Sequence, residues 1–247
     1  MGIGGGIIIV PTLYLIYNTT TRFDDSSILI VAIATSLSCI VFTSASAAFA
    51  QNRRHMILWA LVIKLLPWLL VGSVFASYVV PLLPALVLKV GIACFLIAVA
   101  VIMISSWQPP AGRVFPGYLG GGLIGTSAGF ISGSAGIAGG NVIVPTLIFF
   151  NVPPHNSTAT SSFLGVPIAL SGSLGYLFFA PQVGHPELIG YVDPIAFIAI
   201  ITGSILAAPI GVKIAYKISP PLLKKIFGGM LILASTRMLI DVFNHQA

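Results

Sequence analysis

The segment Gly2-Ile-Gly-Gly-Gly-Ile-Ile-Ile-Val-Pro-Thr-Leu13 returns as Gly136-Ile-Ala-Gly-Gly-Asn-Val-Ile-Val-Pro-Thr-Leu147, with nine of twelve positions identical. A match of this length indicates an internal duplication of the chain. Each copy places several glycines directly before an apolar stretch that carries a proline, and glycine lets the backbone leave helical geometry. The repeat therefore predicts two related halves, each with a break inside an apolar segment.

The composition is that of a membrane protein. Hydrophobic residues make up 57% of the 247 residues, charged residues make up 6%, and the mean hydropathy is +1.07. So few polar side chains cannot solvate a globular surface. A helical crossing needs about 20 apolar residues. Segments of that kind lie near 27–50, 57–80, 85–107, 116–134, 158–180, 193–215 and 222–243. We expect an all-α polytopic membrane protein with about seven full spans.

Other classes of protein have little support in the sequence. Cys39 and Cys94 lie in apolar runs without metal-ligand spacing, so we expect no metal, no cofactor and no disulfide framework. The formal charge of +6 is better explained by orientation in a membrane than by binding to nucleic acid. An enzyme is disfavoured, because no HExxH motif, no buried aspartate pair and no serine with a histidine at matching depth is present.

The basic residues predict the orientation of the spans. Cytoplasmic loops are enriched in lysine and arginine, so the loops with Arg53 and Arg54, with Arg113 and with Lys213, Lys217, Lys224 and Lys225 should be inside. Counting crossings then puts 18–26, 81–84, 181–190 and the C-terminus outside, and 51–55, 108–115, 151–157 and 214–221 inside. Corresponding loops of the two halves thus fall on opposite faces. We expect inverted repeats, 1–110 and 111–247, within one domain of the cell membrane.

The second copy of the motif predicts a hairpin. Because both flanking loops are inside, 116–150 must enter the membrane and return. Residues 139–150 cover about 18 Å as a helix, which is short of the roughly 30 Å hydrocarbon core. We therefore expect a descending helix, a glycine break and a half-helix from Asn141 to Phe150. The first repeat should have the matching half-helix from Ile7 to Tyr17 but lack a leading helix, either because that arm was lost or because the start lies too far downstream.

The two glycine breaks predict a binding site for an anion. Half-helices that begin there would direct free N–H groups and the positive end of a helix dipole toward the midplane, and nearby hydroxyl and amide groups would add donors. The expected substrate ligands are Gly4, Gly5, Gly6, Thr35, Ser36, Gly139, Gly140, Asn141, Thr160 and Ser161, with Pro11 and Pro145 as kinks. An alternative interpretation is that these small residues only allow the helices to pack closely. We prefer that interpretation for Gly120, Gly121 and Gly122.

The acidic residues favour an anionic substrate by their positions. All five, Asp24, Asp25, Glu187, Asp193 and Asp241, lie in loops or at span ends, whereas a cation carrier or proton relay usually has a carboxylate at mid-depth. Lys64 is the ionisable residue that we place well inside a span, where it would either attract the anion or extend its ammonium to the cytoplasmic face. The sequence leaves open whether transport is coupled to protons or another ion, and which oligomer forms.

The paired glycine motifs, the Ala-Thr-Ser triplets at 34–36 and 159–161 and the apolar spans between them resemble the sulfite exporter TauE/SafE family, also called the toluene-sulfonate uptake permease group. The resemblance covers essentially the whole chain. It implies a secondary transporter that moves small sulfur-containing anions, such as sulfite or organosulfonates, across the cytoplasmic membrane, often outward. Its partners would be the small anion and the lipid bilayer. A passive anion channel and a non-transporting membrane scaffold are the alternatives.

Overall fold

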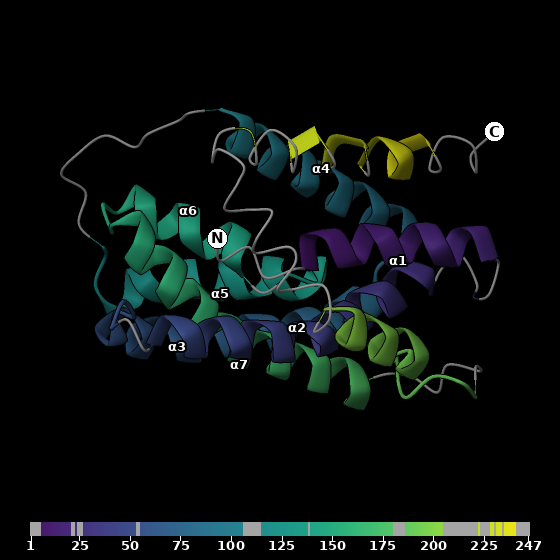
Figure 1. The fold of residues 1–247 in the computed structure, drawn as a ribbon, viewed down its shortest axis with the longest axis horizontal. Coiled ribbons are helices and arrows are strands. Elements are labelled where there is room, and N and C mark those ends of the chain that lie inside the picture. The colour runs from purple at the N-terminus through teal and green to yellow at the C-terminus, as the bar shows by residue number, and fades with distance from the viewer. Residues whose placement is uncertain are drawn as a thin grey trace.

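The computed structural model describes residues 6–20, 23, 27–52, 55–105, 115–137, 139–179, 186–204, 222, 228–229, 231–233 and 235–240. The helices in chain order are α1 (Gly6–Thr20), α2 (Ile28–Asn52), α3 (Trp59–Val79), the 3-10 turn η1 (Val80–Leu82), α4 (Ala85–Ile104), α5 (Tyr118–Ala135), α6 (Gly140–Phe149) and α7 (Pro154–Phe178). Apolar helices also cover Pro194–Ser204 and Leu231–Ile240. Within these residues no strand forms beyond a single bridge between Ile189 and Val192. The predicted all-α class is confirmed there (Figure 1).

Four segments of the described chain are long and apolar enough to cross a membrane. They are Ile28–Phe49, Trp59–Leu82, Ala85–Ile102 and Pro154–Phe178. These segments match the predicted spans 27–50, 57–80, 85–107 and 158–180, while α5 occupies the predicted span 116–134. The predicted spans 193–215 and 222–243 fall partly outside the described residues, as does the predicted outer C-terminus. The total of seven spans therefore stays a prediction.

Apolar side chains cover much of the outer surface of the bundle. Ile63, Val71 and Phe75 on α3, and Val87 and Val101 on α4, are each more than half exposed. In water a surface of this kind would drive association, whereas in a bilayer it meets hydrocarbon of the same character. The helices satisfy their own backbone hydrogen bonds, which a membrane-spanning segment requires. The exposed surface thus suits lipid.

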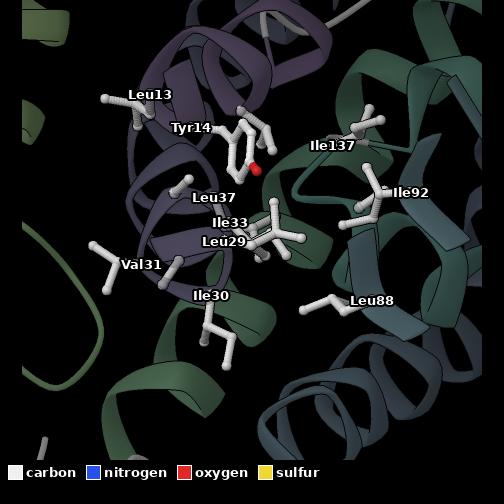
Figure 2. Close-up of a cluster of buried hydrophobic side chains, with 14 of the residues drawn as sticks. Leu13, Tyr14, Leu29, Ile30, Val31, Ile33, Leu37, Leu88, Ile92 and Ile137 are labelled. Atoms are coloured by element: carbon white, nitrogen blue, oxygen red, sulfur yellow. The ribbon is translucent and has the colours of Figure 1, made fainter. Parts of the chain in front are cut away.

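The largest core cluster joins helices from both halves of the chain. Figure 2 shows Tyr14 of α1 and Ile33 of α2 on one side of this cluster, with Leu88 and Ile92 of α4 on the other. Ile137, from the segment between α5 and α6, belongs to the same cluster and is 1% exposed. The segment that follows α5 is therefore buried against helices of the first half, where irregular backbone within a membrane protein is tolerated.

Glycines bring α3 and α5 into close contact. Gly72 of α3 faces the backbone of α5, and Gly129 of α5 faces the backbone of α3 at Leu69, so that a side chain at either position would collide with main-chain atoms. A Cβ added to Gly122 would lie 2.9 Å from the indole ring of Trp68. Small residues at such positions let membrane helices approach closely and gain van der Waals contact. These glycines therefore have a packing role.

The two short helices lie in different parts of the bundle. In Figure 1, α1 lies in the right half of the view and α6 in the left half. The side-chain amide of Asn156, in the first turn of α7, donates to the carbonyl oxygen of Met56, in the segment before α3, at 3.0 Å. Elsewhere in the bundle, Tyr17 donates to the carboxylate of Asp193 at 2.9 Å. The start of α7 therefore contacts the segment before α3, and α1 contacts the start of the helix Pro194–Ser204.

Candidate functional site

The break between α5 and α6, residues 136–139, contains two glycines in the left-handed region. Gly136 follows α5 with φ +67°, and Gly139 precedes α6 with φ +72°. Side chains strain this conformation, so glycine allows one helix to end and the next to begin here. The N–H of Ile137 donates to the carbonyl oxygen of Ser132 at 2.9 Å and satisfies the end of α5. The glycine break that the sequence predicts is present.

The first residue of α1 lies against this break. A Cβ added to Gly6 would lie 2.5 Å from the carbonyl oxygen of Gly136 and 3.2 Å from the Cα of Ile137. A Cβ added to Gly136 would in turn lie 2.7 Å from Val10 of α1. Ser36 of α2 donates its hydroxyl to the same Gly136 carbonyl oxygen at 2.9 Å. The start of α1 therefore meets the break of the second half, and α2 fastens that break.

Backbone donors are available at the start of α6. The N–H groups of Val142 and Ile143 donate to the carbonyl oxygen of Gly139 at 3.0 and 2.6 Å and form the first hydrogen bonds of the helix. The N–H groups of Gly140 and Asn141 precede them and have no carbonyl within α6 to bind. The helix dipole adds a partial positive charge at this end. The start of α6 therefore has the polarity that an anion needs.

Two buried polar atoms beside α6 and α7 have no partner. The side-chain amide nitrogen of Asn141 in α6 and the hydroxyl of Ser161 in α7 make no hydrogen bond with any described residue. Ser161 is fully buried. A buried donor without an acceptor costs about 1–3 kcal/mol, so native proteins rarely leave one without a reason. Both atoms were predicted as ligands, and both are free to donate to a bound acceptor.

The two predicted threonines make equivalent hydrogen bonds. Thr35 of α2 accepts the backbone N–H of Asp193, and Thr160 of α7 accepts the backbone N–H of Leu58, each at 3.0 Å. Leu58 directly precedes α3, and Asp193 directly precedes the helix Pro194–Ser204. Both threonines are fully buried. Each hydroxyl oxygen therefore accepts a hydrogen bond from the residue that precedes a helix of the other half. Its own proton can still be donated to another acceptor.

The remaining predicted residues divide into three groups. Gly4 and Gly5 lie outside the described residues. Pro11 and Pro145 take the same place, as the sixth residue of α1 and of α6 respectively. Lys64 lies on the exposed surface of α3. The structure therefore brings the first glycine motif at Gly6 and the second motif together, but it leaves Lys64 on the outside of the bundle.

Asp193 lies at a span end, as expected, because it directly precedes the helix Pro194–Ser204. Its burial was not expected, and its side chain is 1% exposed. The carboxylate accepts the hydroxyl of Tyr17 at 2.9 Å and the N–H groups of Ile195 and Ala196 at 2.9 and 3.2 Å. It therefore caps the helix Pro194–Ser204 and is buried next to Thr35. An aspartate followed by a proline is a typical helix start, a signal that could have identified the cap.

Lys89 is a second buried ionisable residue that the sequence did not single out. It lies in α4 and is 7% exposed, whereas Lys64 was expected to be the ionisable residue within a span. Its ammonium lies 5.6 Å from the centre of the Tyr14 ring. Ile92, Ala93 and Leu96 follow at helical spacing and are buried. Because α4 is apolar on every side, its sequence carried no signal that Lys89 belongs to an inward face.

The described residues show a groove but no metal cluster. The groove, of about 470 Å³, lies between α5 and α6 and includes Pro145 and Thr146 among mainly apolar neighbours. Within the described ranges, no three histidine, cysteine, aspartate or glutamate side chains gather in one place. The polar groups that surround the break are therefore hydroxyl, amide and backbone N–H groups, which bind an anion through hydrogen bonds.

Comparison with known proteins gives similarity, over most of the chain, to proteins described as probable membrane transporters. A protein of Methanocaldococcus jannaschii, described as a probable membrane transporter protein, is 32% identical over 93% of this chain and 85% of its own length. A protein of Haemophilus influenzae with the same description is 28% identical over 97% of this chain and 91% of its own length. A protein of Bacillus subtilis, also described as a probable membrane transporter protein, is 25% identical over 98% of this chain and 92% of its own length. No solved structure matches this chain.

The family comparison covers nearly the whole sequence. Residues 1–238 match the family described as sulfite exporter TauE/SafE. The predicted resemblance is thereby confirmed, and with it a multi-pass membrane protein of apolar helices. From its glycine motifs, its helical spans and this match, we conclude that the chain belongs to the TauE/SafE family of membrane transporters.

Proposed function

We propose that this protein is a secondary transporter that exports small sulfur-containing anions, such as sulfite or organosulfonates, across the cytoplasmic membrane. The observation that carries the proposal is the meeting of Gly6, at the start of α1, with the break that precedes α6. Two helix starts in one buried region direct partial positive charge toward the same place. The description of the family, sulfite exporter, supports an oxyanion of sulfur as the substrate.

The anion would be bound by donors from both halves. The Asn141 amide and the Ser161 hydroxyl supply the unpartnered side-chain donors, and the N–H groups of Gly140 and Asn141 supply backbone donors. The hydroxyl proton of Thr35 supplies one more donor, from the first half. Sulfite and sulfonate oxygens accept several hydrogen bonds at once, which matches a site of many neutral donors. No full positive charge is needed at the break for such binding.

Two inverted repeats, 1–110 and 111–247, would provide alternating access. The reciprocal contacts support this arrangement, because Thr35 of the first half holds Asp193 of the second, while Thr160 of the second half holds Leu58 of the first. A pair of contacts exchanged in this way is what a two-fold axis produces. The placement of α1 and α6 in different parts of the bundle supports it further (Figure 1). Movement of one repeat against the other would then expose the site to each face in turn.

Transport by the purified protein in liposomes tests the proposal. The unmodified protein should move sulfite with saturable kinetics and show counterflow, because a carrier exchanges labelled for unlabelled substrate across the membrane. The double variant Asn141→Ala with Ser161→Ala should lose most of this activity, while Thr202→Ala, on the exposed face of the helix Pro194–Ser204, should keep it. Flux that does not saturate would indicate a channel. Absence of flux for sulfite, sulfoacetate and other sulfonates would overturn the proposal and favour a scaffold.

A further inference from the structure

The described residues include two lysines in very different surroundings. Lys64 is exposed on α3, whereas Lys89 is 7% exposed as the fifth residue of α4. Lys89 shares its face of α4 with Ile92 and Leu96, which belong to the largest core cluster. An ionisable side chain buried in a membrane-spanning helix is costly, and such residues usually face the interior of the bundle and take part in function.

The ammonium of Lys89 lies beside Tyr14 of α1. It approaches to 5.6 Å from the centre of the Tyr14 ring, and Tyr14 is fully buried. Tyr14 is eight residues beyond Gly6 in α1, which corresponds to about 12 Å along the helix at 1.5 Å per residue. A lysine that only extends toward lipid headgroups would direct its ammonium out of the bundle. Lys89 instead directs its ammonium at the helix that begins at the glycine break.

No carboxylate in the described part of the chain forms an ion pair with Lys89. Its recorded partner is the face of the Tyr14 ring, and a cation–π contact leaves the ammonium N–H donors unused. The buried carboxylate of Asp193 is held by the Tyr17 hydroxyl and by two N–H groups of its own helix. An ammonium that has no anionic partner among the described side chains can be neutralised by a bound anion.

We infer that Lys89 recognises the charge of the transported anion, as a specificity-determining residue on the path along α1 between the glycine break and the end of the bundle where α1 ends. This inference rests on the proposed anion transport. Lys89 would favour oxyanions that carry two negative charges over those that carry one, because the attraction grows with the charge of the ligand. The neutral donors at the break would bind either kind. Lys89 would therefore select the charge of the anion, while the neutral donors at the break would bind its oxygen atoms.

Initial rates of sulfite uptake into proteoliposomes test the role of Lys89. Lys89→Met keeps the length and apolar stem of the side chain but removes its charge, and it should raise the half-saturating sulfite concentration about tenfold while changing the maximal rate less than about twofold. Lys89→Arg should stay within about threefold of the unmodified protein, because it keeps the charge. Lys64→Met, which removes a charge from the exposed face of α3, is the matched control and should behave as the unmodified protein.

Competition by other anions measures the preference for charge. Sulfate, a dianion, should inhibit uptake less well in Lys89→Met than in the unmodified protein, while methanesulfonate, a monoanion, should inhibit both about equally. Unchanged inhibition by sulfate, or an unchanged half-saturating concentration in Lys89→Met, would overturn the inference and leave the proposed transport intact. Absence of uptake by the unmodified protein would instead overturn the proposed transport, and the inference with it.

A measurement on the unmodified protein covers the case in which Lys89→Met fails to fold. Acetylation of each lysine by an amine-reactive reagent is followed by mass spectrometry with and without saturating sulfite. Bound sulfite should slow the modification of Lys89 about fivefold and leave that of Lys64 unchanged, because a bound anion covers the ammonium. Equal rates at Lys89 with and without sulfite would contradict the inference.

Discussion

The hydroxyl oxygen of Thr35 in α2 accepts the backbone N–H of Asp193 at 3.0 Å. The hydrogen bond joins residues 158 positions apart in the sequence, and both partners are buried. It has a counterpart in the bond from Leu58 to Thr160 at the same distance. Each threonine fastens the start of a helix from the other half of the chain, so the two halves depend on each other for their buried hydrogen bonds.

Replacing Thr35 with valine should destabilise the protein by about 1–3 kcal/mol, because the buried N–H of Asp193 loses its acceptor while the volume of the side chain is kept. The measurement is the free energy of unfolding in detergent micelles. Thr202→Val is the matched control, because that exposed hydroxyl bonds only to carbonyl groups of its own helix. The control should change stability by less than about 0.5 kcal/mol. Equal effects of the two variants would contradict the importance of the contact.

Tyr17 and Asp193 should be energetically coupled. Tyr17→Phe removes the hydroxyl that donates to the Asp193 carboxylate at 2.9 Å, and Asp193→Asn removes the charge that strengthens this bond. In a double-mutant cycle on the free energy of unfolding, the coupling should be about 0.5–3 kcal/mol. Tyr78→Phe, at an exposed ring on α3, combined with Asp193→Asn should give additive effects. Additivity in the first cycle would show that the contact contributes little.

Two glycines should respond to alanine in opposite directions. Gly139 has φ +72°, so alanine there should cost about 1–2 kcal/mol from the backbone alone, and its Cβ would lie 2.8 Å from Ile143. Gly91 lies within α4 with open space around its Cα, so alanine there should be neutral or stabilise by up to about 1 kcal/mol. Thermal unfolding of both variants checks the difference. A tolerated alanine at residue 139 would argue against the left-handed break.

Removing the unpartnered donors should have opposite effects on stability and on binding. Ser161→Ala deletes a buried hydroxyl that has no partner among the described residues, so the ligand-free protein should become more stable by up to about 1 kcal/mol. The same change should reduce the stabilisation that saturating sulfite produces, because one donor to the anion is lost. Thermal unfolding with and without sulfite measures both quantities. A loss of stability together with unchanged stabilisation by sulfite would assign Ser161 to packing.

The proposed orientation in the membrane can be checked with single cysteines. His155 is exposed in the first turn of α7, and Glu187 is exposed beyond the end of that helix. In a background with Cys39 and Cys94 replaced by alanine, Glu187→Cys should react with a membrane-impermeant maleimide added to intact cells, while His155→Cys should react only after the membrane is opened. This result is expected because the distribution of lysine and arginine among the loops places 181–190 outside and 151–157 inside. The reverse pattern would invert the proposed topology.

The sequence predicted the short helices closely, because their limits depend on local chemistry. The expected half-helix from Asn141 to Phe150 corresponds to α6, Gly140–Phe149, and the expected one from Ile7 to Tyr17 lies within α1, Gly6–Thr20. Gly136 and Gly139 have positive φ, which glycine adopts readily, so they end α5 and begin α6. The burial of Asp193 and Lys89 was missed, because burial depends on which helices pack together and not on the residues next to them in the sequence.

By itself, the sequence determined the class of protein, the repeated glycine motif, the glycine break between α5 and α6 and the family, since apolar content, repeats and backbone freedom are properties of the residues and their order. Only the tertiary structure decided which polar groups meet. It brought Gly6 against Gly136, joined Thr35 to Asp193 and turned Lys89 inward, because these contacts form when helices distant in sequence pack side by side. The same packing left Asn141 and Ser161 without partners among the described residues.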